Sequence, residues 1–277
     1  MPTQIVELSA GPIEYLDSGE GPVLVFLHGA MKDGRVWREV VSGLESDYRC
    51  IRPTMPLGAH RLPMHSDADL SVAGLARLVG EFLEALDLRE VTLIQNHWGA
   101  AQVMLAEGCA DRIDRLVLTA CEAFDNYPPG APGRLFARLA HIPFALDIMG
   151  TALRSSWIRR RAASSDVTAV HPLPTDLADD WQRRFTDPAI RRDLAKVLRD
   201  TYTPEDKSRW AAAAADFDKP VLVIWAERDK LMPRDHGRRL ADSFAQAELV
   251  EIADSGTCIP LDQPAGLTAT IAKFLAG

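Results

Sequence analysis

The regular alternation of apolar runs and helical stretches constrains this 277-residue chain more than any other feature. Residues 23–27 are apolar throughout, which is typical of a strand buried on both faces. Residues 91–95, 115–120 and 220–225 also predict strands, whereas residues 70–88 repeat apolar side chains at helical spacing. This order predicts an α/β fold, with a mostly parallel twisted sheet, right-handed crossovers and helices on both faces.

Further elements continue the pattern toward both ends of the chain. We expect an opening hairpin around Gly11-Pro12, because two short apolar stretches flank this turn dipeptide. The other predicted strands are 5–8, 13–16, 48–52 and 248–252, and the other predicted helices are 37–44, 99–109, 235–244 and 263–275.

The alternation is interrupted between residues 123 and 207, where several helical stretches contain no clear buried strand. We interpret this segment as an inserted helical lid over a core formed by residues 1–122 and 208–277. The segment contains 13 Arg or Lys and 11 Asp or Glu residues, so it is more basic than the rest of the chain. The run at 159–161, three arginines, predicts either a solvated helix face or contact with an anionic substrate.

Composition excludes several classes of partner. A net charge of −8 does not suit a polyanion, so we expect no nucleic acid. No apolar run approaches the length that crosses a bilayer, and the first residues do not resemble a signal peptide, so we expect no membrane partner and a cytoplasmic location. The four scattered cysteines predict neither a disulfide framework nor a zinc site. We expect a monomer or homodimer that binds a small-molecule substrate.

The most specific local motif is residues 93–102, Leu-Ile-Gln-Asn-His-Trp-Gly-Ala-Ala-Gln, which predicts a strand, a sharp turn and a small-residue helix. It resembles the nucleophile elbow of the α/β-hydrolase superfamily. Other segments follow in the order that this resemblance implies. Residues 28–31 follow a strand, where the superfamily builds half of its oxyanion hole. Asp229 occupies the place of the acid, and the loop 255–264 occupies that of the histidine.

The motif residues depart from the superfamily pattern at the two most important positions. His97 stands where the nucleophile is expected, and Thr257 stands where the catalytic histidine is expected. Trp98 and Gly99 resemble the Asp-Trp-Gly elbow of haloalkane dehalogenases and epoxide hydrolases, in which an aspartate attacks carbon and a histidine activates water. Neither Ser-His-Asp acyl transfer nor aspartate-based dehalogenation runs unchanged with these residues.

His97 is the centre of the functional hypothesis. A histidine is tolerated in the positive-φ conformation of an elbow, and Asp229 is predicted to hold its ring directly or through a water. His97 then acts as general base or nucleophile, and a loss of rate on titrating a single group near pH 6–7 would favour its role as base in a non-hydrolytic reaction. The backbone N–H groups of Trp98 and of Ala30 or Met31 are expected to face an oxyanion, and Thr257 to hydrogen-bond substrate or water.

Three functional classes follow from these residues. The first is an atypical hydrolase that acts on a small, largely apolar organic molecule, with secondary metabolism as the expected setting. The second is a lyase, isomerase, cyclase or cofactor-free oxygenase that uses His97 as base. The third is a non-catalytic binding protein, and His97 as an engineered replacement for an aspartate is a further alternative. No metal-ligand or dinucleotide motif occurs, so the expected reaction needs no cofactor.

Several weaker candidates surround this centre. Glu122 follows a predicted strand, where some relatives keep an alternative acid, and predicts a substrate contact, a helix cap or a salt bridge. Cys258 is either a thiol nucleophile or a small buried side chain. His60 predicts a substrate contact or a hydrogen bond within its loop. Lid aromatic residues are expected either to line an apolar pocket or to form ordinary core; they are Phe124, Tyr127, Phe136, Phe144 and Trp157.

Overall fold

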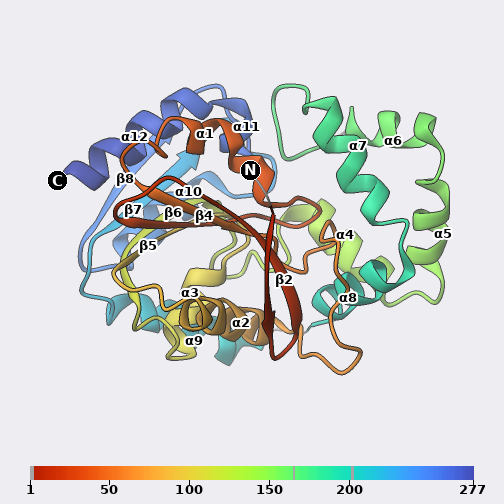
Figure 1. Ribbon diagram of the computed structural model, residues 1–277, viewed down its shortest axis with the longest axis horizontal. Coiled ribbons are helices and arrows are strands. Elements are labelled where there is room, and N and C mark those ends of the chain that lie inside the picture. Colours follow the sequence, from red (N-terminus) through yellow and green to blue (C-terminus); the bar gives the residue numbers. More distant parts are fainter. Residues whose placement is uncertain (1–2, 165, 201–202) are drawn as a thin grey trace.

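An eight-stranded sheet runs through the computed structural model, which describes residues 3–164, 166–200 and 203–277 (Figure 1). The strand order is β1-β2-β4-β3-β5-β6-β7-β8. β2 is antiparallel to both of its neighbours, and every pair from β4 and β3 onward is parallel. The strands are β1 (Gln4–Leu8), β2 (Gly11–Ser18), β3 (Val23–Leu27), β4 (Arg49–Pro53), β5 (Val91–His97), β6 (Ile113–Cys121), β7 (Val221–Ala226) and β8 (Ala247–Ile252).

The continuous apolar strands are explained by two separate cores, one on each face of the sheet. In β3, Val25 and Leu27 belong to one core, whereas Leu24 and Phe26 belong to the other. Strand β7 divides its side chains between the two cores in the same alternating way. Side chains on successive residues of a strand point to opposite faces of the sheet. A strand that is buried on both faces is therefore apolar at nearly every position.

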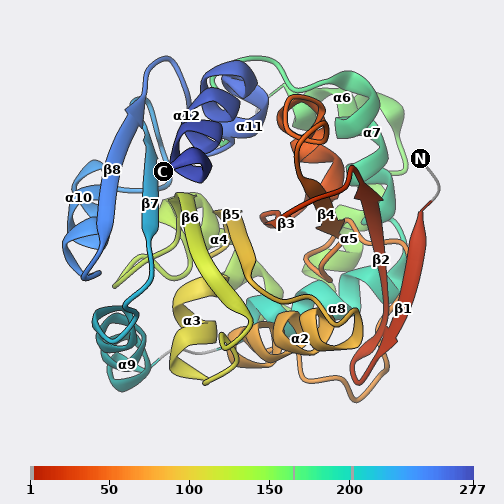
Figure 2. The ribbon, with the colours of Figure 1, turned by 60° about the vertical axis from the view of Figure 1, so that its left-hand side comes forward.

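Helices cover both faces of the sheet (Figure 2). The helices α2, α3, α9 and α10 contribute to the first core, and α1, α11 and α12 contribute to the second. Their bounds are η1 (Gly34–Trp37), α1 (Arg38–Ser42), α2 (Val72–Ala85), α3 (Ala100–Ala106), α9 (Pro204–Ala215), α10 (Arg234–Asp242), α11 (Ile259–Asp262) and α12 (Pro264–Ala276). The predicted α/β arrangement, a mostly parallel sheet with helices on both faces, is therefore confirmed. The short α11 was not predicted, because four residues cannot show a helical period.

Five of the helices between β6 and β7 form a separate layer beside the sheet (Figure 1). We use the name lid for this layer and its loops, and its role as a cover over a site stays a prediction. These helices have a small apolar core of their own, which includes Leu146, Phe185 and Leu194. The boundary that we predicted at residues 207 and 208 falls inside α9, which packs against α3. None of the described helices is long and apolar enough to cross a membrane. The five helices are α4 (Gly130–Ala140), α5 (Ala145–Ala152), α6 (Ser156–Ala163), α7 (Thr175–Arg184) and α8 (Pro188–Leu198).

Candidate active site

His97 lies at the carboxyl end of β5, in the sharp turn that leads into α3. Its φ of 69° is in the left-handed region, where histidine is one of the better tolerated residues. The imidazole packs directly against the backbone of Gly29, where a side-chain Cβ would overlap His97 Nδ1. The glycine after His28 is thus required by the close approach of the elbow.

The register of the sheet brings Glu122 to the same place as His97. His97 pairs with Cys121 across β5 and β6, and the N–H of Glu122 donates to the His97 carbonyl at 2.9 Å. The carboxyl ends of adjacent parallel strands meet at one edge of a sheet, which is where ligands bind in open α/β folds. Two titratable side chains, one imidazole and one carboxyl, therefore face one cavity.

This cavity, of about 480 Å³, lies between the elbow and the lid. Four other parts of the chain contribute mainly apolar side chains to its wall. Of the predicted site residues, Ala30, Met31, His97, Trp98 and Glu122 line it, whereas Asp229, Thr257 and His60 do not. Its apolar lining includes Leu57, Val72, Pro128, Pro129, Pro132, Phe136, Met149, Val167, Leu194, Val197, Leu198 and Leu231.

Sequence reasoning missed one charged pair in the cavity wall. Lys32 Nζ lies 3.3 Å from Asp166 Oδ2, and both residues line the cavity. Asp166 belongs to the lid, where its carboxylate also accepts bonds from the N–H and hydroxyl of Thr168. Lys32 directly follows the 28–31 motif, which was a usable signal, but nothing in the sequence indicates that a lid aspartate reaches it.

The environment moves the pKa values of His97 and Glu122 in opposite directions. Burial, assisted by the nearby Lys32 ammonium, lowers the pKa of His97 to about 4. Burial raises the pKa of Glu122 to about 8, although the N–H of Gly99 favours the carboxylate. At neutral pH the imidazole is therefore unprotonated and the carboxyl largely protonated. The two groups therefore differ in protonation state within one cavity, which is a common arrangement of acid–base pairs.

The expected oxyanion hole is not preformed by the backbone donors that we predicted. The N–H of Trp98 donates to the Asn96 carbonyl at 2.8 Å, and that of Met31 donates to the Leu57 carbonyl at 2.8 Å. Ala30 alone of the three has an N–H without a partner among the described residues. The indole Nε1 of Trp98 is also buried and has no partner there. A developing negative charge would thus meet a side-chain donor before it met a pair of backbone donors.

Asp229 pairs with Thr257 and not with His97. Thr257 Oγ1 donates to Asp229 Oδ1 at 2.7 Å, and the N–H groups of Leu231 and Met232 donate to the same oxygen. Asp229 Oδ2 is buried and has no partner among the described residues. Among the described residues, no direct hydrogen bond links Asp229 to His97. The prediction that Asp229 holds the His97 ring directly is therefore wrong. Threonine is short, so the carboxylate bonds to it instead of reaching an imidazole.

The weaker candidates have structural surroundings. His60 Nε2 lies 3.2 Å from Asp193 Oδ2 of α8, and both side chains are buried, so this hydrogen bond ties the His60 loop to α8. Burial raises the pKa of the Cys258 thiol to about 12, so Cys258 is not poised as a thiolate. Phe136 lines the cavity, but Phe144 and Trp157, which we also expected as lining or core, are exposed. Phe124 packs near His236, and Tyr127 packs on Trp210.

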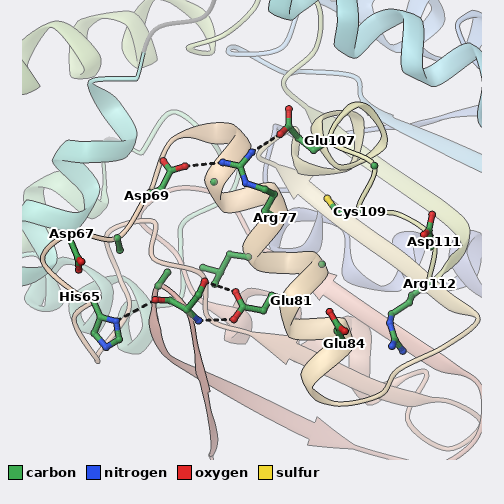
Figure 3. Close-up of a pocket in the computed structure, with 17 residues that line it drawn as sticks. His65, Asp67, Asp69, Arg77, Glu81, Glu84, Glu107, Cys109, Asp111 and Arg112 are labelled. Atoms are coloured by element: carbon green, nitrogen blue, oxygen red, sulfur yellow. Dashed lines mark hydrogen bonds and ion pairs between the residues drawn. The ribbon is translucent and has the colours of Figure 1, made fainter.

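A larger hollow of about 730 Å³ follows the outer side of α2 (Figure 3). It shares no lining residue with the His97 cavity. Its side chains are mostly charged and several are already paired, as Arg77 is with both Asp69 and Glu107. The lining has six carboxyl side chains and two arginines, so it is acidic overall, and we do not assign a reaction to it. No group of three or more His, Cys, Asp or Glu side chains in the described ranges is arranged to hold a metal ion.

Because Asp229 makes no direct hydrogen bond to His97, a substitution of Asp229 should have little effect on catalysis. Asp229→Asn is expected to change kcat/KM by less than about tenfold, because burial already raises the pKa of this carboxyl and Asn keeps the acceptor for Thr257. Steady-state kinetics on a turned-over substrate would measure this. A loss of about a hundredfold or more, with the melting temperature unchanged, would instead indicate that a water relays Asp229 to His97.

Comparison with known proteins agrees with the geometry. The alpha/beta hydrolase fold family matches residues 22–264. A cis-3-alkyl-4-alkyloxetan-2-one decarboxylase of Xanthomonas campestris pv. campestris is 28% identical, covering 95% of this chain and 92% of the relative. Haloalkane dehalogenase 2 of Mycobacterium tuberculosis is 26% identical, covering 95% and 91%. An alpha/beta hydrolase fold protein from Burkholderia ambifaria superposes with a TM-score of 0.79 at 21% identity, covering 98% and 97%.

The family match spans the elbow, the lid and the Asp229–Thr257 loops together, and the structural match spans nearly the whole chain. The two curated relatives are enzymes by name, and both align over more than nine-tenths of their length. The chain belongs to the alpha/beta hydrolase fold family and is a hydrolase-type enzyme of that superfamily.

Proposed function

We propose that the protein transforms a small, largely apolar organic molecule by general acid–base catalysis, with His97 as base and Glu122 as acid. The observation that carries this proposal is the pair of opposite pKa shifts in one cavity, to about 4 for His97 and about 8 for Glu122. Each group is in the protonation state that its role requires at neutral pH. The apolar lid and core side chains around them favour a substrate of the same character.

A role as base fits His97 better than a role as nucleophile. Attack by the imidazole on an alkyl carbon would leave a stable carbon–nitrogen bond, and a second base would be needed to activate water. The superfamily's position for that base is Thr257, whose hydroxyl is committed to Asp229. As a base, His97 needs only to remove a proton from water or substrate and return it within the same cycle.

Charge that develops on the substrate has two side-chain partners. The ammonium of Lys32 is paired with Asp166 in the cavity wall and is close enough to disfavour protonation of His97. The Trp98 indole N–H is buried without a partner on the same wall. Both are fixed donors in a poorly hydrated cavity, where such contacts are stronger than in water. We assign them to the leaving oxygen or halide, or to an enolate.

The names of the relatives narrow the substrate class. One acts on an oxetan-2-one with two alkyl groups, and the other on haloalkanes. Both names describe small apolar molecules with a breakable bond from carbon to oxygen or halogen. A molecule of that class is our first choice here. A lyase reaction, which breaks the substrate bond without adding water, is the second candidate, and the relative named as a decarboxylase is the observation that favours it.

The pH profile of the wild-type enzyme tests the acid–base pair. The assay uses a panel of strained lactones, epoxides, haloalkanes and short alkyl esters. We expect kcat/KM to decrease as the pH falls below about 4, where His97 is protonated, and as it rises above about 8, where Glu122 ionises. Intact-mass spectra of quenched turnover should show no adduct on the protein. An alkyl or acyl adduct on His97 would make it a nucleophile, and a single limb near pH 6–7 would contradict the pairing.

Water labelled with oxygen-18 distinguishes the two reaction classes on the same substrate. Hydrolysis incorporates the label into product, whereas a lyase reaction does not. If the panel gives thermal stabilisation without turnover, the third class, a binding protein, replaces both proposals.

A further inference from the structure

The outer surface of the lid exposes an unusual number of large apolar side chains. Figure 1 shows α5 and α6 at the outer edge of the molecule, on the side away from β7 and β8. Phe144 is 75% exposed and Trp157 is 67% exposed. We call the exposed apolar residues of this segment the lid rim; they are Leu135, Ile142, Phe144, Ile148 and Trp157. Five of the seven large apolar side chains that are exposed on the described residues fall within residues 135–157, and such a concentration marks an interaction site more often than scattered single residues do.

The same segment has a strong positive charge. Residues 130–164 contain six arginines and one acidic residue, Asp147, in a chain whose net charge is −8. Asp147 is paired with Arg191 of α8. The exposed arginines of this segment that pair with no carboxylate of the described residues are Arg134, Arg138, Arg154 and Arg160. Apolar and cationic side chains therefore share one short stretch of the lid, while the rest of the chain is acidic.

We propose that the lid rim docks on an anionic lipid surface. Aromatic and aliphatic side chains that enter the headgroup region, surrounded by arginines that contact lipid phosphates, are the requirements for peripheral binding. Peripheral binding needs no membrane-spanning helix. A second copy of the chain fits less well, because a two-fold contact through this face would set arginines against arginines.

The helices that carry the lid rim also line the His97 cavity on their inner side. Phe136, next to Leu135 in α4, lines the His97 cavity, as does Met149, next to Ile148 in α5. Helices α4 and α5 therefore present apolar side chains to the cavity on one side and to the exterior on the other. An apolar molecule dissolved in the lipid would meet the lid at the point where it covers the cavity. The docking itself does not depend on which reaction His97 performs.

Trp157 is a built-in reporter for this proposal. The other five tryptophans are each at most 5% exposed, so Trp157 is the indole whose emission responds to lipid contact. With vesicles of phosphatidylcholine containing about 30% phosphatidylglycerol, we expect a blue shift and quenching by brominated acyl chains. With pure phosphatidylcholine, binding should be at least about tenfold weaker, and added salt should reduce the difference between the two compositions.

Substitutions separate the apolar from the electrostatic contribution. Phe144→Ser with Ile148→Ser, which keeps the reporter, is expected to weaken partitioning by at least about tenfold. Arg138→Gln with Arg154→Gln, which removes two of the four arginines without a carboxylate partner among the described residues, should reduce the preference for phosphatidylglycerol. Ile5→Ser is the matched control, because Ile5 is also an exposed apolar residue (59%), lies on edge strand β1, and its substitution should have no effect.

Three results would overturn the proposal. They are no shift of Trp157 emission with either vesicle, equal losses for the Ile5 control and the lid-rim variants, and a concentration-dependent dimer that buries Trp157 without lipid. Circular dichroism and melting temperature verify that each variant is folded, since all substituted side chains are exposed.

Discussion

Replacing His97 by asparagine is expected to lower kcat/KM by at least about a thousandfold while the melting temperature changes little. Asparagine tolerates the left-handed conformation of the elbow, where φ is 69°, and fits in the space of the imidazole. It cannot accept and return a proton at neutral pH. The loss would therefore report the chemistry of the imidazole and not the strain of the turn.

The companion variant His97→Ala separates these two effects. Alanine should give the same kinetic loss plus a small destabilisation, about 1 kcal/mol, because it is poorly suited to a positive φ and leaves space beside Gly29. Chemical denaturation measures the second effect. Rates within about tenfold of wild type in either folded variant would exclude His97 as base and favour a different catalytic group in the cavity.

The fold could be predicted from the sequence because the patterns that indicate it lie in consecutive residues. Strand β3 has the bounds that its apolar run predicts, and strands β5, β6 and β7 lie within two residues of prediction at each end. Runs that are apolar at every position occur when a strand is buried on both faces, so they predict both the strand and the helices that cover it. The elbow was accessible for the same reason, since strand, turn and small-residue helix are consecutive.

The site was only partly accessible, because its decisive contacts join distant segments. The bond from Thr257 to Asp229 links loops after β7 and β8, and the pair of Lys32 with Asp166 links the core to the lid. Sequence order places these loops at one edge of the sheet but does not say which side chain takes which partner. The hydrogen bond from the Trp98 N–H to the Asn96 carbonyl likewise depends on the backbone conformation of the elbow turn.

The pKa values were inaccessible for a related reason. An isolated histidine titrates near pH 6.5, and the titration near pH 6–7 that would favour a non-hydrolytic reaction was taken from that value. Burial and the Lys32 ammonium both disfavour the charged imidazole, so they move its pKa to about 4. The sequence around the elbow predicts neither how deeply His97 is buried nor where the Lys32 ammonium lies.

Glu122→Gln is expected to lower kcat/KM by about a hundredfold near neutral pH and to abolish the limb near pH 8. Glutamine keeps the shape of the side chain but has no proton to give. Glu84→Gln is the matched control, because Glu84 is an exposed carboxyl on α2 outside the His97 cavity (Figure 3). An unchanged alkaline limb in Glu122→Gln would assign that limb to another group.

The same substitution is expected to stabilise the protein as the pH rises. The pKa of Glu122 is about 8 in the folded protein and near 4.5 when unfolded, so ionisation opposes folding increasingly between these values. Glu122→Gln removes this penalty, and we expect a gain of about 2 kcal/mol at pH 9 that vanishes below pH 4.5. Part of the carboxyl faces the cavity, which keeps the gain below the full linkage value. Denaturation at both pH values measures it. A loss of activity together with a pH-dependent gain in stability is the pattern of a group kept for catalysis at the expense of the fold, and a stability difference independent of pH would contradict the raised pKa.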